Sequence, residues 1–498
     1  MGNTQQFDLV ISGGRVVDPE TELEAVRNVG ITDGQIAAVS EDPLEGVKTL
    51  DATGHIVAPG FIDIHSHAQQ LPAAWVQAFD GVTTALELES GLLPVDVAYE
   101  RMAKEGRPIN YGLGSAWSFA RVQVLQPKAG KPDGTLKWFQ NAFSLSGWQT
   151  DVPSPEQLEQ IIDLVEEGLN QGGIGVSVNA GYAPGMGRKE YYELAKLAFK
   201  HGVATFTHDR YMSTLEPRSS FEALGEQIGL AAITGAHMHI CHINSVCGRD
   251  LDDATELLQR AESRNIPITV EAYTYGALCT AIGAEFFRGP EWLTRFGGDE
   301  YSAMELRGKA LTKEKIEELQ SSGPGSVVVF HFLHEEEEPD DMKLLDKAVL
   351  YPGGAIASDC TPWSDANGAF LEGEVWPLPD DAFSHPRSAG CFSRLFAIWV
   401  RERQVLSLLD AVRKTTLIPA QVLEEFVPQM KKKGRLQVGC DADVIVFDLN
   451  TIKDNATFVA PAQLSSGQRH VVVNGVPIIE EGERIGDAKP GRPIRRQV

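Results

Sequence analysis

The sequence is short of basic residues. Its 498 residues include 44 lysines and arginines against 69 aspartates and glutamates, so the formal net charge at pH 7 is -25. A surface of this charge repels nucleic acids and anionic lipids. No apolar run approaches the roughly 18 to 20 residues that are needed to cross a bilayer. We therefore expect a small-molecule partner, with no nucleic acid and no membrane.

Cysteine is also scarce, and no two cysteines form a CxxC pair. The N-terminal residues lack the basic and apolar regions of a secretory leader. These features are typical of reduced, mostly buried thiols in a cytoplasmic protein. All six cysteines lie after residue 240: Cys241, Cys247, Cys279, Cys360, Cys391 and Cys440.

In the middle of the chain, short apolar segments alternate with helical patterns. One such stretch has a strand at residues 173–177, a helix at 189–201, a strand at 204–208 and a helix at 221–234. This βαβ rhythm predicts a parallel sheet closed into a (β/α)8-type TIM barrel. A doubly wound sheet is the alternative, but the glycine-rich phosphate loop that would follow its first strand is missing.

The two ends of the chain instead show short β-like runs separated by turn signals. An Asp-Gly pair near the start and an Asn-Gly pair near the end are typical of hairpin turns. We predict one small β-domain formed by residues 1–58 and 434–498, with the barrel in residues 59–433. A charged, glycine-containing segment at about 288–324 breaks the barrel rhythm and predicts an insertion or lid.

Metal-competent side chains stand at the ends of several predicted barrel strands. His65 and His67 follow an apolar run and, two positions apart on an extended segment, point to the same side. Glu89, His208 and His242 end three further strands. Because barrel chemistry lies at the carboxyl ends of the strands, we predict that these five residues share a metal site.

A carboxylate ends a fifth apolar run. Asp359 follows residues 354–358, and a carboxylate at this place can ligate a metal or accept a proton from water. An amine leaves poorly unless it is protonated, so we expect Asp359 to return that proton to the departing nitrogen. A buried structural role is the alternative.

An ordered series of motifs resembles the amidohydrolase superfamily and, within it, the N-acyl-D-amino-acid deacylase (D-aminoacylase) branch. The segment Val57-Ala-Pro-Gly-Phe-Ile-Asp-Ile-His-Ser-His67 carries the likeness to the superfamily. The resemblance covers nearly the whole chain. The motifs similar to the branch are Gly81-Val-Thr-Thr84, Gly181-Tyr-Ala-Pro-Gly185, Phe206-Thr-His208, Cys241-His242, Glu271-Ala-Tyr-Thr-Tyr275, Ser358-Asp359, His385-Pro-Arg387, Gly434-Arg-Leu-Gln-Val-Gly-Cys-Asp-Ala-Asp-Val-Ile-Val-Phe-Asp448 and Val473-Asn-Gly475.

This resemblance implies a fold, a cofactor and a ligand set. The fold is a TIM barrel inserted between the two halves of a small β-sandwich domain. The usual metal is zinc, with one or two Zn2+ ions per chain, or another divalent metal. In the branch, a tightly bound ion is held by a cysteine and by two histidines that fall on His208 and His242. The HxH pair belongs to a weaker second site.

The sequence departs from the branch at the cysteine ligand, because the nearest position is Ser90. Serine is a poor zinc ligand, whereas a carboxylate is a good one and can bridge two ions. We therefore expect Glu89 to ligate, with Glu87 in reserve. An ion pair or a capping role is the alternative for both glutamates.

Substrate recognition departs from the branch as well. A lysine two residues after the second ligand histidine helps to hold the substrate carboxylate in the branch, but that position is Asn244 here. We expect Arg387 to replace it, with Tyr273 or Tyr275 adding a hydroxyl donor. An internal ion pair is the alternative for Arg387, and barrel packing is the alternative for the tyrosines. We expect His239, which lies outside the strand alternation, to be structural.

The residues and the resemblance together predict a metal-dependent amidohydrolase that acts on carbon-nitrogen bonds other than peptide bonds. The simplest substrate is an N-acyl-D-amino acid, whose amide bond would be hydrolysed. Hydrolysis of another amide, such as a carbamoyl, cyclic or peptide-like substrate, is the nearest alternative. A catalytically inactive scaffold on the same fold is more remote, because the expected metal ligands are all present. The oligomeric state is left open, with a homo-oligomer among the alternatives.

Overall fold

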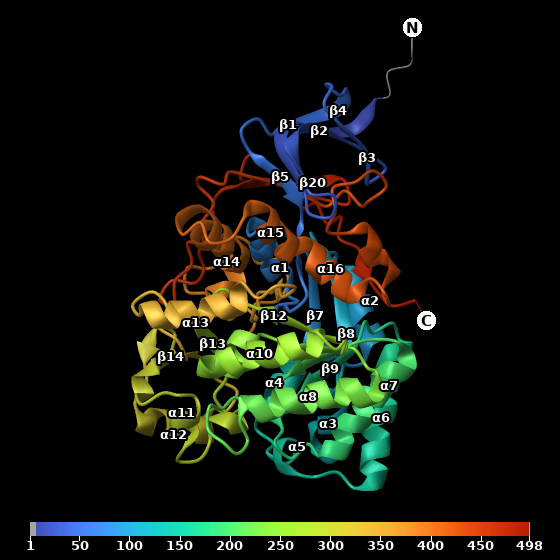
Figure 1. The fold of residues 1–498 in the computed structure, drawn as a ribbon. Coiled ribbons are helices and arrows are strands. Elements are labelled where there is room, and N and C mark those ends of the chain that lie inside the picture. The colour runs from blue at the N-terminus through green and yellow to red at the C-terminus, as the bar shows by residue number, and fades with distance from the viewer. Residues whose placement is uncertain (1–5, 498) are drawn as a thin grey trace.

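A computed structural model describes residues 6–497 of the chain. Residues 1–5 of the predicted N-terminal half of the β-domain, and residue 498 of its C-terminal half, lie outside the described residues. Figure 1 shows the strands of the N-terminal segment gathered with β20 at one end of the molecule, and the helix-covered barrel below them. Within residues 6–497, no helix is both long and apolar enough to cross a membrane.

The small β-domain is one sheet built from both ends of the chain. Its strands run in the order β21-β20-β19-β18-β5-β1-β2-β3, with β4 paired to β1. The two ends are joined where β18 pairs antiparallel with β5. The bounds are β1 (Phe7–Asp18), β2 (Leu23–Thr32), β3 (Gln35–Ser40), β4 (Gly46–Asp51), β5 (Ile56–Pro59), β18 (Val444–Phe447), β19 (Gln468–Val473), β20 (Val476–Glu480) and β21 (Glu483–Arg484).

The two hairpin signals of the sequence are the turns of this sheet. Asp33 and Gly34 join β2 to β3, and Asn474 and Gly475 join β19 to β20. All four residues have positive φ, between 48° and 80°. This conformation matches the type I′ turns that Asp-Gly and Asn-Gly pairs favour in two-residue hairpins.

The barrel consists of eight parallel strands that nearly close on themselves. Its order is β17-β12-β11-β10-β9-β8-β7-β6, and an isolated parallel bridge between Ser66 and Cys360 joins the two outermost strands. This near closure confirms the predicted fold class over a doubly wound sheet, whose edges stay open. The bounds are β6 (Phe61–Asp63), β7 (Val82–Leu92), β8 (Asn110–Ala116), β9 (Val176–Asn179), β10 (Thr205–His208), β11 (Met238–Ile240), β12 (Ile268–Ala272) and β17 (Ala355–Ile356).

Helices alternate with the barrel strands and cover the outside of the barrel (Figure 1). The sequence marks their ends: Ser219 caps the start of α8, and α7 ends at Gly202, which has a φ of 62°. The main outer helices are α1 (Leu71–Phe79), α2 (Val95–Glu105), α3 (Trp117–Leu125), α6 (Pro155–Asn170), α7 (Arg188–His201), α8 (Ser220–Thr234), α10 (Leu251–Glu262), α13 (Pro339–Val349) and α14 (Arg387–Arg394).

The predicted insertion at 288–324 lies within a larger unit. A separate antiparallel sheet of order β13-β16-β14-β15 follows β12, and it carries two helices. Two further short helices follow α3, a short helix follows β11, and two short helices precede the C-terminal strands. The bounds are β13 (Ala277–Ala281), β14 (Met304–Leu306), β15 (Lys309–Ala310), β16 (Val327–His331), α11 (Trp292–Arg295), α12 (Lys313–Ser322), α4 (Leu136–Ala142), α5 (Gly147–Thr150), α9 (Ile243–Cys247), α15 (Leu408–Val412) and α16 (Ile418–Leu423).

The last described strand, β22 (Pro493–Ile494), leaves the small domain and returns to the barrel. It pairs in parallel with β8 rather than with the strands of the small β-domain. The hydroxyl of Tyr99, on α2, donates a hydrogen bond to the carbonyl of Ile494 at 2.6 Å. The C-terminal segment therefore adds a further link between the small β-domain and the barrel.

Candidate metal centre

Six predicted site residues lie together at the carboxyl ends of the barrel strands. His65 and His67 follow β6, Glu89 lies in the second half of β7, and His208 ends β10. His242 follows β11 by two residues, and Asp359 follows β17 by three. All are buried except His67, whose side chain is 15% exposed. The fold thus gathers residues separated by almost 300 positions, because parallel strands end at the same face of a barrel.

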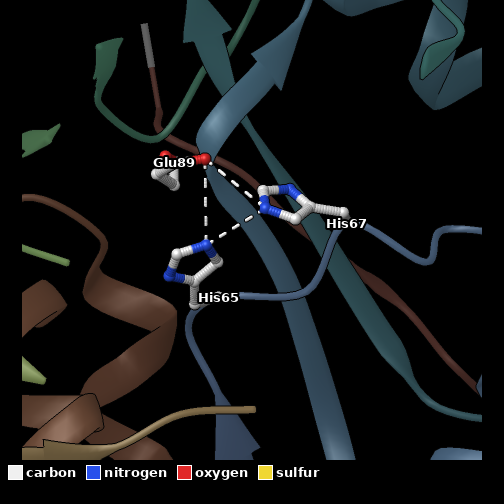
Figure 2. Close-up of side chains that lie close together, drawn as sticks. All are labelled: His65, His67 and Glu89. Atoms are coloured by element: carbon white, nitrogen blue, oxygen red, sulfur yellow. Dashed lines mark hydrogen bonds and ion pairs between the residues drawn. The ribbon is translucent and has the colours of Figure 1, made fainter. Parts of the chain in front are cut away.

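Glu89 lies between two pairs of histidines. Its Oε2 is 3.8 Å from His65 Nε2 and 3.4 Å from His67 Nε2 (Figure 2). Its Oε1 is 3.1 Å from His208 Nδ1 and 3.9 Å from His242 Nε2. Each carboxylate oxygen therefore faces one histidine pair, which is the arrangement expected of a bridging ligand.

The HxH pair is held from behind by two buried glutamates. His65 Nδ1 contacts Glu271, and His67 Nδ1 lies 2.9 Å from Glu87 Oε2. We infer that each Nδ1 carries the proton that it donates to its carboxylate, which leaves the Nε2 lone pairs toward Glu89. Glu87, the reserve ligand of the sequence prediction, is thus placed as an orienting partner of His67.

The second histidine pair has no such carboxylate partners among the described residues. His208 Nε2 lies 3.0 Å from the sulfur of Met212, and the buried His242 Nδ1 has no hydrogen-bond partner there. The rings of the two histidines pack edge to face, with centroids 4.8 Å apart. The orientation of this pair therefore depends on packing.

Two residues of the site have a strained backbone. His242 has a φ of 34° and Asp359 a φ of 48°, in the left-handed region that residues with a Cβ rarely adopt. Such conformations cost about 1 to 3 kcal/mol each and cluster at functional sites. Here they turn the side chains of both residues, just past their strands, toward Glu89 and the HxH pair.

Asp359 connects the histidines to a buried arginine. Its Oδ1 is 3.3 Å from His67 Nε2 and 3.5 Å from His65 Nε2, while Arg387 Nη2 lies 2.7 Å from its Oδ2. Arg387 Nε also donates to the Asp359 carbonyl at 2.7 Å. Burial opposes ionisation, but Arg387 and His65 outweigh it and hold the pKa of Asp359 well below its usual range. The internal ion pair considered for Arg387 is therefore formed.

None of the four predicted substrate contacts, Arg387 included, lines the cavity at the site. The Asn244 amide donates to the carbonyls of Tyr273 and Tyr275 at 3.2 and 3.1 Å. The Tyr275 hydroxyl donates to Asp454 at 3.1 Å. The buried Tyr273 hydroxyl has no hydrogen-bond partner among the described residues, and the Arg387 guanidinium lies 4.5 Å from the centre of its ring.

The sequence prediction missed Glu271. It lies on β12 and contacts His65 with one oxygen, while its other oxygen is 3.2 Å from His239 Nε2. His239 Nδ1 in turn lies 2.8 Å from the Thr269 hydroxyl. His239 is thus linked to the site through Glu271. A carboxylate near the end of a barrel strand was the available signal for Glu271, but its partner depends on the fold.

The electrostatic environment stabilises positive charge beside the HxH pair. Burial alone would lower the pKa of His65, but Glu271 and Asp359 outweigh burial and raise the pKa to about 9. Burial would raise the pKa of Glu89, but His208 and His67 lower it to about 2. Burial and the neighbouring His208 lower the pKa of His242 to about 3. Glu89 is therefore ionised and His242 is neutral, as metal ligands must be, and a bound metal ion would take the place of the second proton on His65.

The donor set fits a divalent metal. Three groups of side chains that include Glu89 or Asp359 offer ligand atoms within 4.8 Å of one another. Glu89 Oε1 and His208 Nδ1 are buried and lack a hydrogen bond despite their 3.1 Å approach, which leaves both free to ligate. Imidazole nitrogens and carboxylate oxygens are the ligands that catalytic zinc prefers. The three groups are His65, His67 and Glu89; His65, His242 and Asp359; and Glu89, His208 and His242.

Comparisons with known proteins find similar proteins over nearly the whole chain. A model of the amidohydrolase family matches residues 142–479. N-acyl-D-glutamate deacylase from Alcaligenes xylosoxydans xylosoxydans is 27% identical, with 99% of this chain and 98% of that protein covered. D-aminoacylase from the same organism is 26% identical, with 99% of each covered.

A solved structure shares the fold. The crystal structure of N-acyl-D-glutamate deacylase from Bordetella bronchiseptica, complexed with zinc and a phosphonate inhibitor that mimics the tetrahedral intermediate, superimposes with a TM-score of 0.77. The two chains are 21% identical, and the match covers 99% of this chain and 100% of that one. The whole chain, including the small β-domain, therefore takes part in the likeness.

Proposed function

This chain belongs to the amidohydrolase family, and from that premise we propose that it is a metal-dependent deacylase of N-acyl-D-amino acids. As an amidohydrolase, it hydrolyses carbon-nitrogen bonds other than peptide bonds. The observation that carries the proposal is the position of Glu89 between two histidine pairs, with Asp359 beside the HxH pair. The named activities of the two curated relatives support the finer assignment.

We propose that zinc, or another divalent ion, is held by the four histidines together with Glu89. Glu89 would belong to both halves of the site, because each of its oxygens faces one histidine pair. A divalent ion bound there would polarise the amide carbonyl and would lower the pKa of bound water far below its normal value, to about 7. The ligands are His65, His67, His208, His242 and Glu89.

Asp359 is the proposed general base and acid. Arg387 holds Oδ2 and keeps the carboxylate ionised, so that Oδ1 can accept a proton from the attacking water. Asp359 then gives this proton to the amide nitrogen, which makes the amine a leaving group. Arg387 thus acts through Asp359. The Tyr273 hydroxyl has no hydrogen-bond partner among residues 6–497, but Tyr273 does not line the cavity, so we assign it no contact with the substrate.

Hydrolysis of a different amide is the second candidate function. It is favoured by the engagement of Asn244 with two backbone carbonyls and of Arg387 with Asp359, which leaves neither side chain free for a substrate carboxylate. A carbamoyl, cyclic or peptide-like amide that lacks a carboxylate next to its nitrogen does not need such a partner. A substrate panel separates the two candidates.

The test combines metal analysis with that panel. The purified protein should hold at least about one equivalent of divalent metal, lose its activity with a chelator and regain it with zinc. It should hydrolyse N-acetyl-D-amino acids faster than their L-forms. Asp359→Asn should lower kcat by about 100- to 10,000-fold, the usual size of a general acid-base contribution. If the protein hydrolyses other amides but no N-acyl-D-amino acid, the deacylase assignment is contradicted. If the purified protein holds no metal, the inactive scaffold is supported.

A further inference from the structure

We propose, on the premise of the deacylase function above, that the cavity beside the metal centre selects an apolar group of the substrate over an acidic one. The cavity encloses about 890 Å³, open solvent at its mouth included. Five of the six site residues described above line it: His67, Glu89, His208, His242 and Asp359. A group in this cavity is therefore attached close to the bond that is cleaved.

The wall of this cavity is largely apolar. Leu136 and Phe139 come from α4, Leu278 from β13 and Val327 from β16, so two segments outside the barrel form much of the wall. Phe286 stacks on the His208 ring, with centroids 5.9 Å apart and planes at 12°. Apolar surface thus continues up to a candidate metal ligand, and burial of an apolar group against it is favourable.

Apart from the proposed metal, no cationic side chain within residues 6–497 lines this cavity to pair with an acidic group, although Arg101, Arg107 and Lys137 line another cavity that shares His67 with it. Among the described residues that line the cavity beside the metal centre, none is lysine or arginine, and the two acidic residues are Glu89 and Asp359. Arg387 is fully buried and paired with Asp359. A carboxylate deep in the cavity, away from the metal, would lose its hydration without gaining a lysine or arginine partner, which is unfavourable in a buried site.

Arginines do line a neighbouring cavity, on the far side of a shared wall. Met212 and Phe286 line both cavities and stand between them. Of the arginines there, Arg210 is paired with Glu226 at 2.7 Å, and Arg295 lies 3.5 Å from Glu291. None of the arginines of this neighbouring cavity lines the cavity beside the metal centre. The four arginines that line the second cavity are Arg210, Arg218, Arg288 and Arg295.

This inference separates the chain from one of its relatives. The protein that is 27% identical is named for N-acyl-D-glutamate, a substrate with an acidic side chain. The apolar cavity instead suits a leucine-like or phenylalanine-like group. The group can belong to the amino acid or to the acyl portion, because both flank the amide.

The test compares three substrates with the zinc-loaded, full-length protein. We expect N-acetyl-D-phenylalanine or N-phenylacetyl-D-glutamate to exceed N-acetyl-D-glutamate in kcat/KM by about 100-fold, the scale of discrimination by an apolar pocket. A preference for N-acetyl-D-phenylalanine shows that the cavity binds the side chain of the amino acid. A preference for N-phenylacetyl-D-glutamate shows that it binds the acyl group. If N-acetyl-D-glutamate is hydrolysed with the same kcat/KM as the other two substrates, the inference is overturned. If none of the three is hydrolysed, the deacylase proposal itself fails.

Two variants of half-buried wall residues sharpen the test. Phe370→Ala should lower kcat/KM for the apolar substrate about tenfold and leave N-acetyl-D-glutamate nearly unchanged. Leu136→Lys should shift the ratio toward N-acetyl-D-glutamate by at least tenfold, because it supplies the missing cation. Phe199→Ala, at a phenylalanine that is 59% exposed and outside the cavity, is the matched control. If both wall variants keep the parent ratio while folded, the cavity does not set specificity.

Discussion

The two histidine pairs of the site are supported in different ways. In the HxH half, both Nδ1 atoms contact buried glutamates, Glu271 and Glu87. In the other half, His208 has only the Met212 sulfur behind it, and His242 Nδ1 has no hydrogen-bond partner among residues 6–497. A carboxylate behind a histidine fixes its tautomer and raises its basicity as a ligand. The HxH half is therefore preorganised, whereas the other half depends on Glu89 and on packing.

This difference between the two halves bears on which of them binds its metal ion more tightly. The resemblance assigns the tighter ion to the half that contains His208 and His242, with a cysteine as the third ligand. Glu89 stands near that place instead, and it is shared with the HxH half. The comparison between the halves is therefore open to direct tests through the residues that join or support them.

Replacement of the shared ligand should have the largest effect. Glu89→Gln removes the charge that faces both histidine pairs, so we expect both halves to lose metal affinity and kcat/KM to fall by more than about 1,000-fold. Metal content per chain, measured after gel filtration, checks the first effect, and steady-state kinetics checks the second.

Glu159→Gln, at an exposed glutamate on α6, is the control and should keep full metal content. A Glu89→Gln protein that retains one tightly bound ion would contradict the bridging role. It would show that one half binds metal without the shared carboxylate, and the half that does so could be found by adding His67→Asn or His208→Asn.

Replacement of a supporting glutamate should act on one half only. Glu271→Gln keeps the shape of the side chain but removes its charge, so His65 loses its anionic partner. We expect metal affinity in the HxH half to fall by about 10- to 100-fold, while the affinity of the other half is unchanged. Competition with a chromophoric chelator gives both affinities.

A purely structural role for Glu271 predicts a different result. The melting temperature would fall, and both metal affinities would stay as they are in the parent protein. Glu87→Gln should weaken the same half as Glu271→Gln, because Glu87 supports the other histidine of the pair. If either variant instead weakens the half of His208 and His242, the two halves are not independent.

The sequence alone predicts the fold class and the strand-end residues that lie together at the site. The apolar runs that end in His65, His208 and Asp359 are barrel strands or follow them directly, and parallel strands must end at a common face. The closure of the barrel confirms the prediction of this fold. The placement of the strand ends then follows from topology alone, without knowledge of side-chain contacts.

The supporting contacts could not be predicted in the same way. Glu271 meets His65 across 206 positions, and Arg387 meets Asp359 across 28, so each contact depends on strand register and on a rotamer. The apolar cavity depends on α4 and on the β13-β16 sheet, which lie outside the barrel rhythm. The local sequence pattern of such segments does not indicate how they fold back over a site.

Replacement of the sulfur behind His208 should have the smallest effect. Met212→Leu keeps the volume but removes a weak acceptor from the buried Nε2. We expect about a threefold loss of metal affinity in this half, since a hydrogen bond to sulfur contributes less than the roughly 1 kcal/mol of an ordinary one. Met102→Leu, at a buried methionine on α2, controls for the change of core volume. A loss as large as that of Glu271→Gln would mean that the sulfur orients His208 as firmly as a carboxylate orients His65. The two halves would then be equally preorganised.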